Sequence, residues 1–233
     1  MYKKHCDFYE MVKDWTISDF RTPGIKAEVI VDMLISDFIE DIIRYHFWNS
    51  GQSDVKLLVK ELPIRISEKN YRNAKVDYLV SVGNDKLVLV ELKTTNDSFD
   101  KRQDKRIIEA VDNGADELLG FYREIVELKN GNSSDRQKYK SGFRKYEETL
   151  SAAKLSEEIF KELDYLYISL TDHSKLPEKK KIILKDYCNT EGFSNWLAKR
   201  ENGEERKKLW EKISNILLEC DALPGLLVQK MQP

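Results

Sequence analysis

Two acidic side chains and a lysine stand in two neighbouring apolar stretches, where charge is unexpected. Asp77 lies early in the first stretch, and Glu91 and Lys93 close the second, which begins Leu87-Val88-Leu89-Val90. A buried charge is costly unless it is paired or binds a ligand. Four other acid-x-Lys triplets occur in the chain, but none of them ends an apolar strand pattern. These three residues are therefore the first candidates for chemistry.

The two stretches have the alternating pattern of a β-hairpin, with Gly83-Asn84-Asp85 as its turn. If the turn has three residues, Val82 pairs with Lys86. Counting back along both strands then places Asp77 opposite Glu91, with their Cβ atoms roughly 4.5–5.5 Å apart. A five-residue turn keeps this register, whereas a two-residue turn would send the two carboxylates to opposite faces.

Facing carboxylates repel each other unless a positive charge lies between them. Because ligands that are all oxygen suit a hard cation, we expect Asp77 and Glu91 to bind Mg²⁺ or Mn²⁺. Side chains alternate along a strand, so Lys93 shares a face with Glu91 and can orient or deprotonate a water molecule. An Asp, a Glu and a Lys around a divalent cation are equipped to hydrolyse a phosphodiester.

The pattern Asp77…Glu91-Leu92-Lys93, with one helical pattern before the hairpin and another after it, resembles the PD-(D/E)xK nuclease superfamily. The resemblance covers about residues 25–126 as the core. It implies the restriction-endonuclease-like fold, an α/β domain with a mixed central β-sheet flanked by helices. It also implies a nuclease that needs Mg²⁺ or Mn²⁺ and hydrolyses the phosphodiester bonds of DNA. The proline that often precedes the family's Asp is absent here, since Val76 stands in its place.

The resemblance implies two further site residues. Glu28 lies two turns before Ile35, on the core-facing side of the first predicted helix, and resembles the family's helix-borne acid. Asp32, one turn later, is the alternative. Gln103 precedes Ile107 by one turn and so also points inward; in some branches of the family a Gln there holds the Lys or the substrate. Each has a plainer interpretation, Glu28 as a first-turn acid favoured by the helix dipole and Gln103 as a surface amide.

The remaining pattern predicts a single domain over residues 1–233. Helices are expected over 25–47, over 107–126 with a break at Gly114, over 139–163, and over 193–220 with a division at Asn202-Gly203. Strands are expected over 55–66, 75–82, 86–93, 165–170 and 181–187. Pro63 marks the first of these strands as an edge strand or a broken one.

Charge and composition narrow the possible functions and locations of the protein. The chain has 39 basic and 41 acidic residues, a net charge of −2, so no overall basic field points to nucleic acid. Locally, however, Lys101, Arg102, Lys105 and Arg106 follow the Glu-x-Lys strand closely, and we expect them to contact the phosphate backbone of DNA. No apolar run is long enough to span a membrane. Three widely separated cysteines indicate a reducing, cytoplasmic setting.

Two alternatives stay open. The same fold could bind nucleic acid or a protein partner with its carboxylates catalytically idle, or the hairpin could be purely structural. The tail over residues 223–228 could pack internally or form a homodimer contact. Nucleotide-driven motors and serine hydrolases receive no support, because the chain has no Walker loop and no G-x-S-x-G motif.

Overall fold

A computed structural model describes residues 27–48, 51, 54–64, 74–94, 101–127, 160–172 and 174–230. Five strands are hydrogen-bonded in the order β1-β2-β3-β4-β5, in a mixed sheet flanked by helices. The chain divides into two compact units. Residues 42–91 and 99–167 form one, here called the hairpin unit. Residues 1–41, 92–98 and 168–233 form the other, here called the terminal unit.

The hairpin unit is built on two antiparallel pairings. Strand β1 (Val55–Ile64) pairs with β2 (Ala74–Val82), with an irregularity between Leu57 and Val59. Strand β1 is the first in the sheet order, so it is an edge strand. Its proline, Pro63, stands one residue before its end, where a missing N–H costs little. The edge position predicted from Pro63 is confirmed.

Strand β3 (Lys86–Lys93) follows β2 through the predicted three-residue turn. Val82 pairs with Lys86, and the pairing continues in the same register to Tyr78 and Val90. The turn begins with Gly83 at φ +64°, a left-handed backbone conformation that residues other than glycine rarely adopt. The Gly83 N–H donates to the carbonyl of Asp54 at 2.7 Å, which ties the turn to the start of β1.

Strand β4 (Glu162–Ser169) runs parallel to β3. At one end the Asp85 carbonyl accepts hydrogen bonds from the N–H groups of Lys161 and Glu162, at 2.9 and 3.1 Å. Eight residues on, the Lys93 carbonyl accepts from Leu170 at 3.2 Å. Residue numbers therefore rise in the same direction along both strands, so β3 and β4 are parallel. Parallel strands that follow one another in the chain need a long crossover connection.

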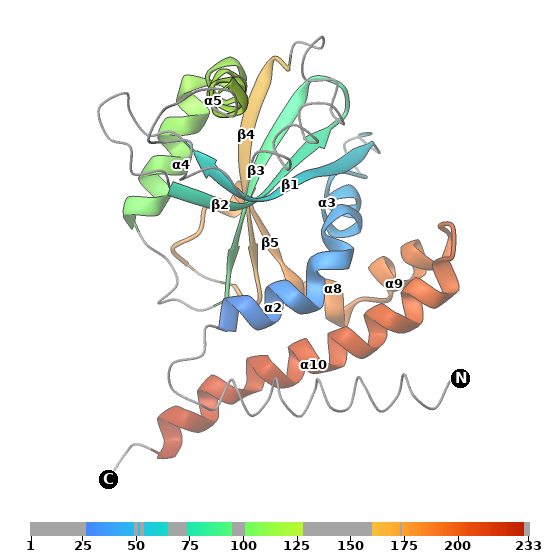
Figure 1. Cartoon of the computed structure of the whole chain (residues 1–233). Helices are drawn as coiled ribbons and strands as arrows, with labels where there is room; N and C mark the ends of the chain where they lie inside the picture. Colours follow the sequence, from blue (N-terminus) through green and yellow to red (C-terminus); the bar gives the residue numbers. More distant parts are fainter. Residues whose placement is uncertain are drawn as a thin grey trace. The chain divides into compact units, whose positions relative to one another are not determined.

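Two helices of the hairpin unit lie in that crossover. Helix α4 (Lys101–Asn113) and helix α5 (Ala115–Glu127) are separated at Gly114, whose φ of +87° ends the first helix. This break is confirmed. Helix α4 buries Ile107 and contacts β2 and α5. In Figure 1, α4 lies on one side of strands β1 to β3 and helix α3 (Ile39–Trp48) on the other.

The helix predicted over 25–47 is interrupted. Helix α2 (Ala27–Ile35) gives way to a 3₁₀ turn over Ser36–Phe38 before α3 begins. The Ser36 hydroxyl donates to the Met33 carbonyl at 3.4 Å, and side-chain bonds of this kind to a preceding carbonyl bend a helix. The apolar spacing was correct, but it did not reveal this local change of helix type.

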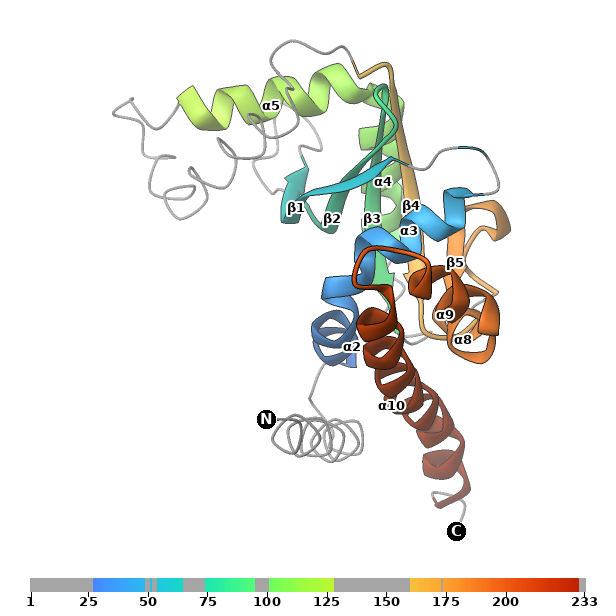
Figure 2. The same cartoon turned by 90° about the vertical axis from the view of Figure 1, so that its right-hand side faces the viewer.

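The terminal unit packs its helices around an aromatic core. Helices α8 (Leu184–Asn189) and α9 (Glu191–Ala198) lie against the long helix α10 (Gly203–Lys230), as Figure 2 shows. The Trp210 ring lies 5.2 Å from Phe38 and 4.9 Å from Phe193, centroid to centroid. All three rings are fully buried. The predicted division of the last helical stretch near Asn202-Gly203 is confirmed.

Three predicted boundaries need correction. Strand β5 is only Lys181–Ile183, and α8 follows directly, because buried Leu184 and half-buried Tyr187 and Cys188 have helical spacing. Helix α10 continues past residue 220 to Lys230. Most of the helix predicted over 139–163 lies outside the described residues, which resume at residue 160. The last part of that prediction is wrong, because strand β4 begins at Glu162.

Candidate active site

Glu91 is a buried carboxylate at the end of the hairpin unit's central strand. The residue is 4% exposed. The side-chain amide Nε2 of Gln103, on α4, donates a hydrogen bond to Glu91 Oε1 at 2.5 Å and another to the Lys75 carbonyl on β2 at 3.3 Å. A hydrogen bond from an amide donor restrains the rotamer of the carboxylate that accepts it. The prediction that Gln103 points inward is therefore confirmed, and its partner is Glu91.

The position of Asp77 relative to Glu91 depends on the register of the hairpin. It is half-buried on β2, one residue before Tyr78, and Tyr78 pairs with Val90. Both strands extend beyond that pair. Continued by one residue, the register would bring Asp77 across from Glu91, on the same face of the sheet. The three-residue turn on which the juxtaposition depended is present.

Lys93 and Glu28 belong to the terminal unit. Lys93 is the last residue of β3 and is 4% exposed, an unusual degree of burial for a lysine. Glu28 lies on α2, but its side chain is outside the described residues. Asp32, its alternative, is half-buried on the same helix.

The predicted DNA-contacting residues occupy the first turns of α4. Lys101, Arg102 and Lys105 are exposed, and Arg106 is half-buried. They share this helix with Gln103, so one short segment carries both the inward amide and a row of outward positive charges. Exposed basic side chains beside a buried acid are suited to contacting a phosphate backbone.

One polar contact of the hairpin unit was not predictable from the sequence pattern. The Tyr167 hydroxyl on β4 donates to the Asp104 carboxylate on α4, next to Gln103. Burial, then the bond to Asp104, raises the pKa of Tyr167, and the negative charge of Glu91 adds to the shift. These residues are 63 positions apart, so no local pattern could have paired them.

The donor set fits a hard cation. Asp77 and Glu91 offer carboxylate oxygens only, and Mg²⁺ is typically held by one or two carboxylates with waters and phosphate oxygens completing its shell. Within the described ranges, no three His, Cys, Asp or Glu side chains gather to form a larger metal-binding cluster. A cation held in the hairpin unit by this pair would take its protein ligands from the Asp77 and Glu91 carboxylates.

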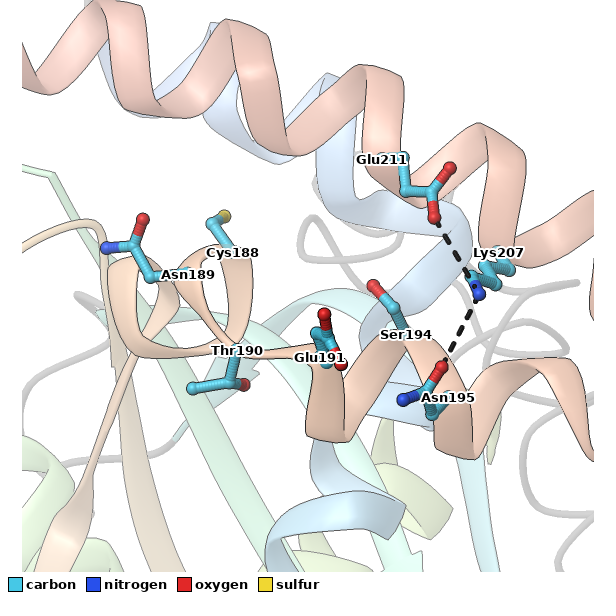
Figure 3. Close-up of a pocket in the computed structure, with 8 residues that line it drawn as sticks. All are labelled: Cys188, Asn189, Thr190, Glu191, Ser194, Asn195, Lys207 and Glu211. Carbon is cyan, nitrogen blue, oxygen red and sulfur yellow. Dashed lines mark hydrogen bonds and ion pairs between the residues drawn. The ribbon is translucent and has the colours of Figure 1, made fainter.

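The terminal unit contains a polar hollow of about 330 Å³ between α8, α9 and α10 (Figure 3). Lys207 Nζ lies 3.4 Å from Asn195 Oδ1 and 4.0 Å from Glu211 Oε1 at one side of it. Cys188 lines the other side; burial raises the pKa of its thiol to about 11, against a smaller opposite effect of the Ser214 hydroxyl. A thiol of that pKa is protonated at neutral pH and is a poor nucleophile.

No protein-family model, no curated protein and no solved structure matches this chain. Among the helices described, none combines the length and hydrophobicity needed to cross a bilayer.

Proposed function

We propose that this protein is a divalent-metal-dependent nuclease of the PD-(D/E)xK kind, hydrolysing phosphodiester bonds of DNA in the cytoplasm. The proposal is supported above all by the hairpin register, which runs from Val82 and Lys86 toward Asp77 and Glu91. A second support is the Gln103 amide, which reaches the buried Glu91 carboxylate from the helix after the Glu-x-Lys strand.

In this proposal Asp77 and Glu91 hold Mg²⁺ or Mn²⁺. When bound, the cation supplies positive charge that offsets the charge of the phosphate in the transition state. Gln103 keeps the Glu91 carboxylate in one orientation. Lys93 follows Glu91 by two positions on β3 and, by strand alternation, faces the same way. Its amine orients the attacking water or accepts a proton from it.

The substrate would be held by α4. Lys101, Arg102 and Lys105 are exposed on the helix that carries Gln103, so phosphate contacts there would lie one helix turn from the residue that holds Glu91. Such contacts position a duplex without reading its sequence, which leaves any sequence preference to other parts of the chain.

The test is plasmid cleavage with and without Mn²⁺ or Mg²⁺. Three variants remove one functional group each and preserve size: Asp77→Asn, Glu91→Gln and Lys93→Met. We expect the first two to abolish metal-dependent cleavage and the third to lower its rate by about 100-fold or more. Glu127→Gln is the matched control, because Glu127 is an exposed acid of another acid-x-Lys triplet and lies on α5.

Equal cleavage by the wild type and the three site variants would reject the proposal and identify a contaminating nuclease. Binding of DNA without cleavage, unchanged by Glu91→Gln, would favour the idle binding module instead. Calorimetric titration with Mn²⁺ separates the cases further, since the proposed site requires Glu91 and Asp77 for metal binding.

A further inference from the structure

Two consecutive residues of α4 form hydrogen bonds to three neighbouring strands of the sheet. Gln103 donates to Glu91 on β3 and to the Lys75 carbonyl on β2. Asp104 accepts a hydrogen bond from the Tyr167 hydroxyl on β4. All these contacts lie within the hairpin unit.

The hydrogen bonds of Gln103 and of Asp104 leave α4 in different directions. Successive residues of an α-helix point about 100° apart around its axis, because a turn contains 3.6 residues. The bonds of Gln103 and the packing of buried Ile107 already restrict the rotation of α4 about its axis. The bond from Tyr167 to Asp104 restrains that rotation at a further point, and so it helps to set where the Gln103 amide meets Glu91.

Tyr167 is suited to this task. Its ring is buried on β4, 1% exposed, and so its hydroxyl is held at a set position. Burial and the neighbouring Asp104 raise the pKa of Tyr167, which keeps the hydroxyl protonated and able to donate at neutral pH. The Glu91 carboxylate lies near enough to contribute to that shift.

We propose that Tyr167, acting through Asp104, is a positioning residue for Glu91: the Tyr167–Asp104 bond holds α4 at the rotation that brings the Gln103 amide onto the Glu91 carboxylate. Its effect on metal binding and cleavage rests on the proposed nuclease function. Its effect on Gln103 does not, since the hydrogen bonds are present in the protein by itself.

The experiment compares Tyr167→Phe with Tyr78→Phe. Each variant removes one hydroxyl from a tyrosine that is 1% exposed on a strand of the same sheet. The Tyr78 hydroxyl has no hydrogen-bond partner among the described residues, so its loss leaves α4 untouched. The primary measurement is hydrogen exchange of the Gln103 side-chain amide by NMR; the second is Mn²⁺ affinity.

We expect Tyr167→Phe to accelerate exchange of the Gln103 amide by about 10-fold and to weaken Mn²⁺ binding by about 10-fold, typical of residues that orient a ligand. Tyr78→Phe should change neither. Asp104→Asn, which keeps an acceptor for the tyrosine, should fall between Tyr167→Phe and the wild type. Asp104→Ala should match Tyr167→Phe.

Unchanged exchange of the Gln103 amide in Tyr167→Phe would overturn the inference, whatever the activity. If the wild type neither binds Mn²⁺ nor cleaves DNA, the nuclease proposal fails, while accelerated exchange in Tyr167→Phe still supports the positioning role. A loss of Mn²⁺ affinity with exchange unchanged would likewise reject the route through Gln103.

Discussion

Arg206 on α10 and Asp41 on α3 form an ion pair across 165 residues of sequence. Nε of Arg206 donates to Asp41 Oδ2 at 3.0 Å, and its Nη2 donates to the same oxygen and to the Asp37 carbonyl, the latter at 2.9 Å. The guanidinium also lies 4.8 Å from the centroid of the Phe38 ring. The Asp41 side chain is 9% exposed. One arginine thus satisfies a nearly buried carboxylate and covers the aromatic core of the terminal unit.

Replacing Arg206 by alanine should destabilise the protein by about 3 kcal/mol, because it removes the guanidinium from a nearly buried carboxylate. Arg206→Lys keeps the charge but not the forked donors, and should recover only part of the loss. Arg200→Ala is the matched control: Arg200 stacks 4.5 Å from the Trp196 ring, a contact worth about 0.5–1 kcal/mol. Urea unfolding measures all three; equal losses for Arg206→Ala and Arg200→Ala would contradict the prediction.

Changing Gln103 should affect stability through Glu91. Gln103→Ala removes a donor from a buried carboxylate and should cost about 1–3 kcal/mol. Gln103→Glu should cost more at pH 7, because two carboxylates would then meet, and it should recover stability as the pH falls and one of them takes up a proton. Urea unfolding at pH 5 and pH 7 is the measurement. A Gln103→Glu variant insensitive to pH would show that the two side chains do not meet.

Stability should decrease at alkaline pH through Cys188. Burial raises the pKa of its thiol from 9.0 to about 11, so above pH 9 the unfolded chain loses this proton while the folded protein keeps it. Unfolding is then favoured, and stability present below pH 9 is lost between pH 9 and pH 11, by about 2–3 kcal/mol at most. Unfolding free energies of the wild type and Cys188→Ser should converge or cross over that interval, with a constant difference below pH 8. A difference in unfolding free energy that stays constant from pH 7 to pH 11 would contradict the role of Cys188.

The basic turns of α4 should govern the salt dependence of DNA binding. Replacing Lys101, Arg102 or Lys105 by glutamine should weaken binding to all sequences alike, and each should lower the slope of log K against log salt by about 1. Lys199→Gln and Lys208→Gln serve as controls, since both lysines are exposed in the terminal unit. Fluorescence anisotropy over a range of salt concentrations measures the slopes; slopes equal to those of the controls would remove α4 from the interface.

The hairpin turn should depend on its first glycine. Gly83→Ala places a side chain at φ +64° and should destabilise the protein by about 1–2 kcal/mol. Gly120→Ala is the matched change in α5, where nothing lies within 4 Å of the added Cβ; there alanine should stabilise by up to about 1 kcal/mol. Thermal unfolding of the two variants should therefore shift in opposite directions.

The hairpin and its register were predictable because the signals involved are short. Alternation over residues 75–82 and 86–93, with a glycine-containing turn between them, depends only on neighbouring residues, and a three-residue turn determines which side chains face each other. The breaks at Gly114 and before Gly203 and the edge strand marked by Pro63 were predictable for the same reason. The 3₁₀ turn at Ser36 was not, since the apolar spacing around it fits an unbroken α-helix equally well.

The sequence by itself therefore determined the secondary structure around Glu91 and the turn of α4 that points Gln103 inward. Only the tertiary structure decided the partners: Gln103 with Glu91, Asp104 with Tyr167, and Arg206 with Asp41. Turn chemistry and side-chain periodicity act over a few residues, whereas a hydrogen bond between distant segments depends on which surfaces the folded chain buries together. The parallel pairing of β4 with β3 belongs to the second kind, because it joins strands that the whole crossover separates.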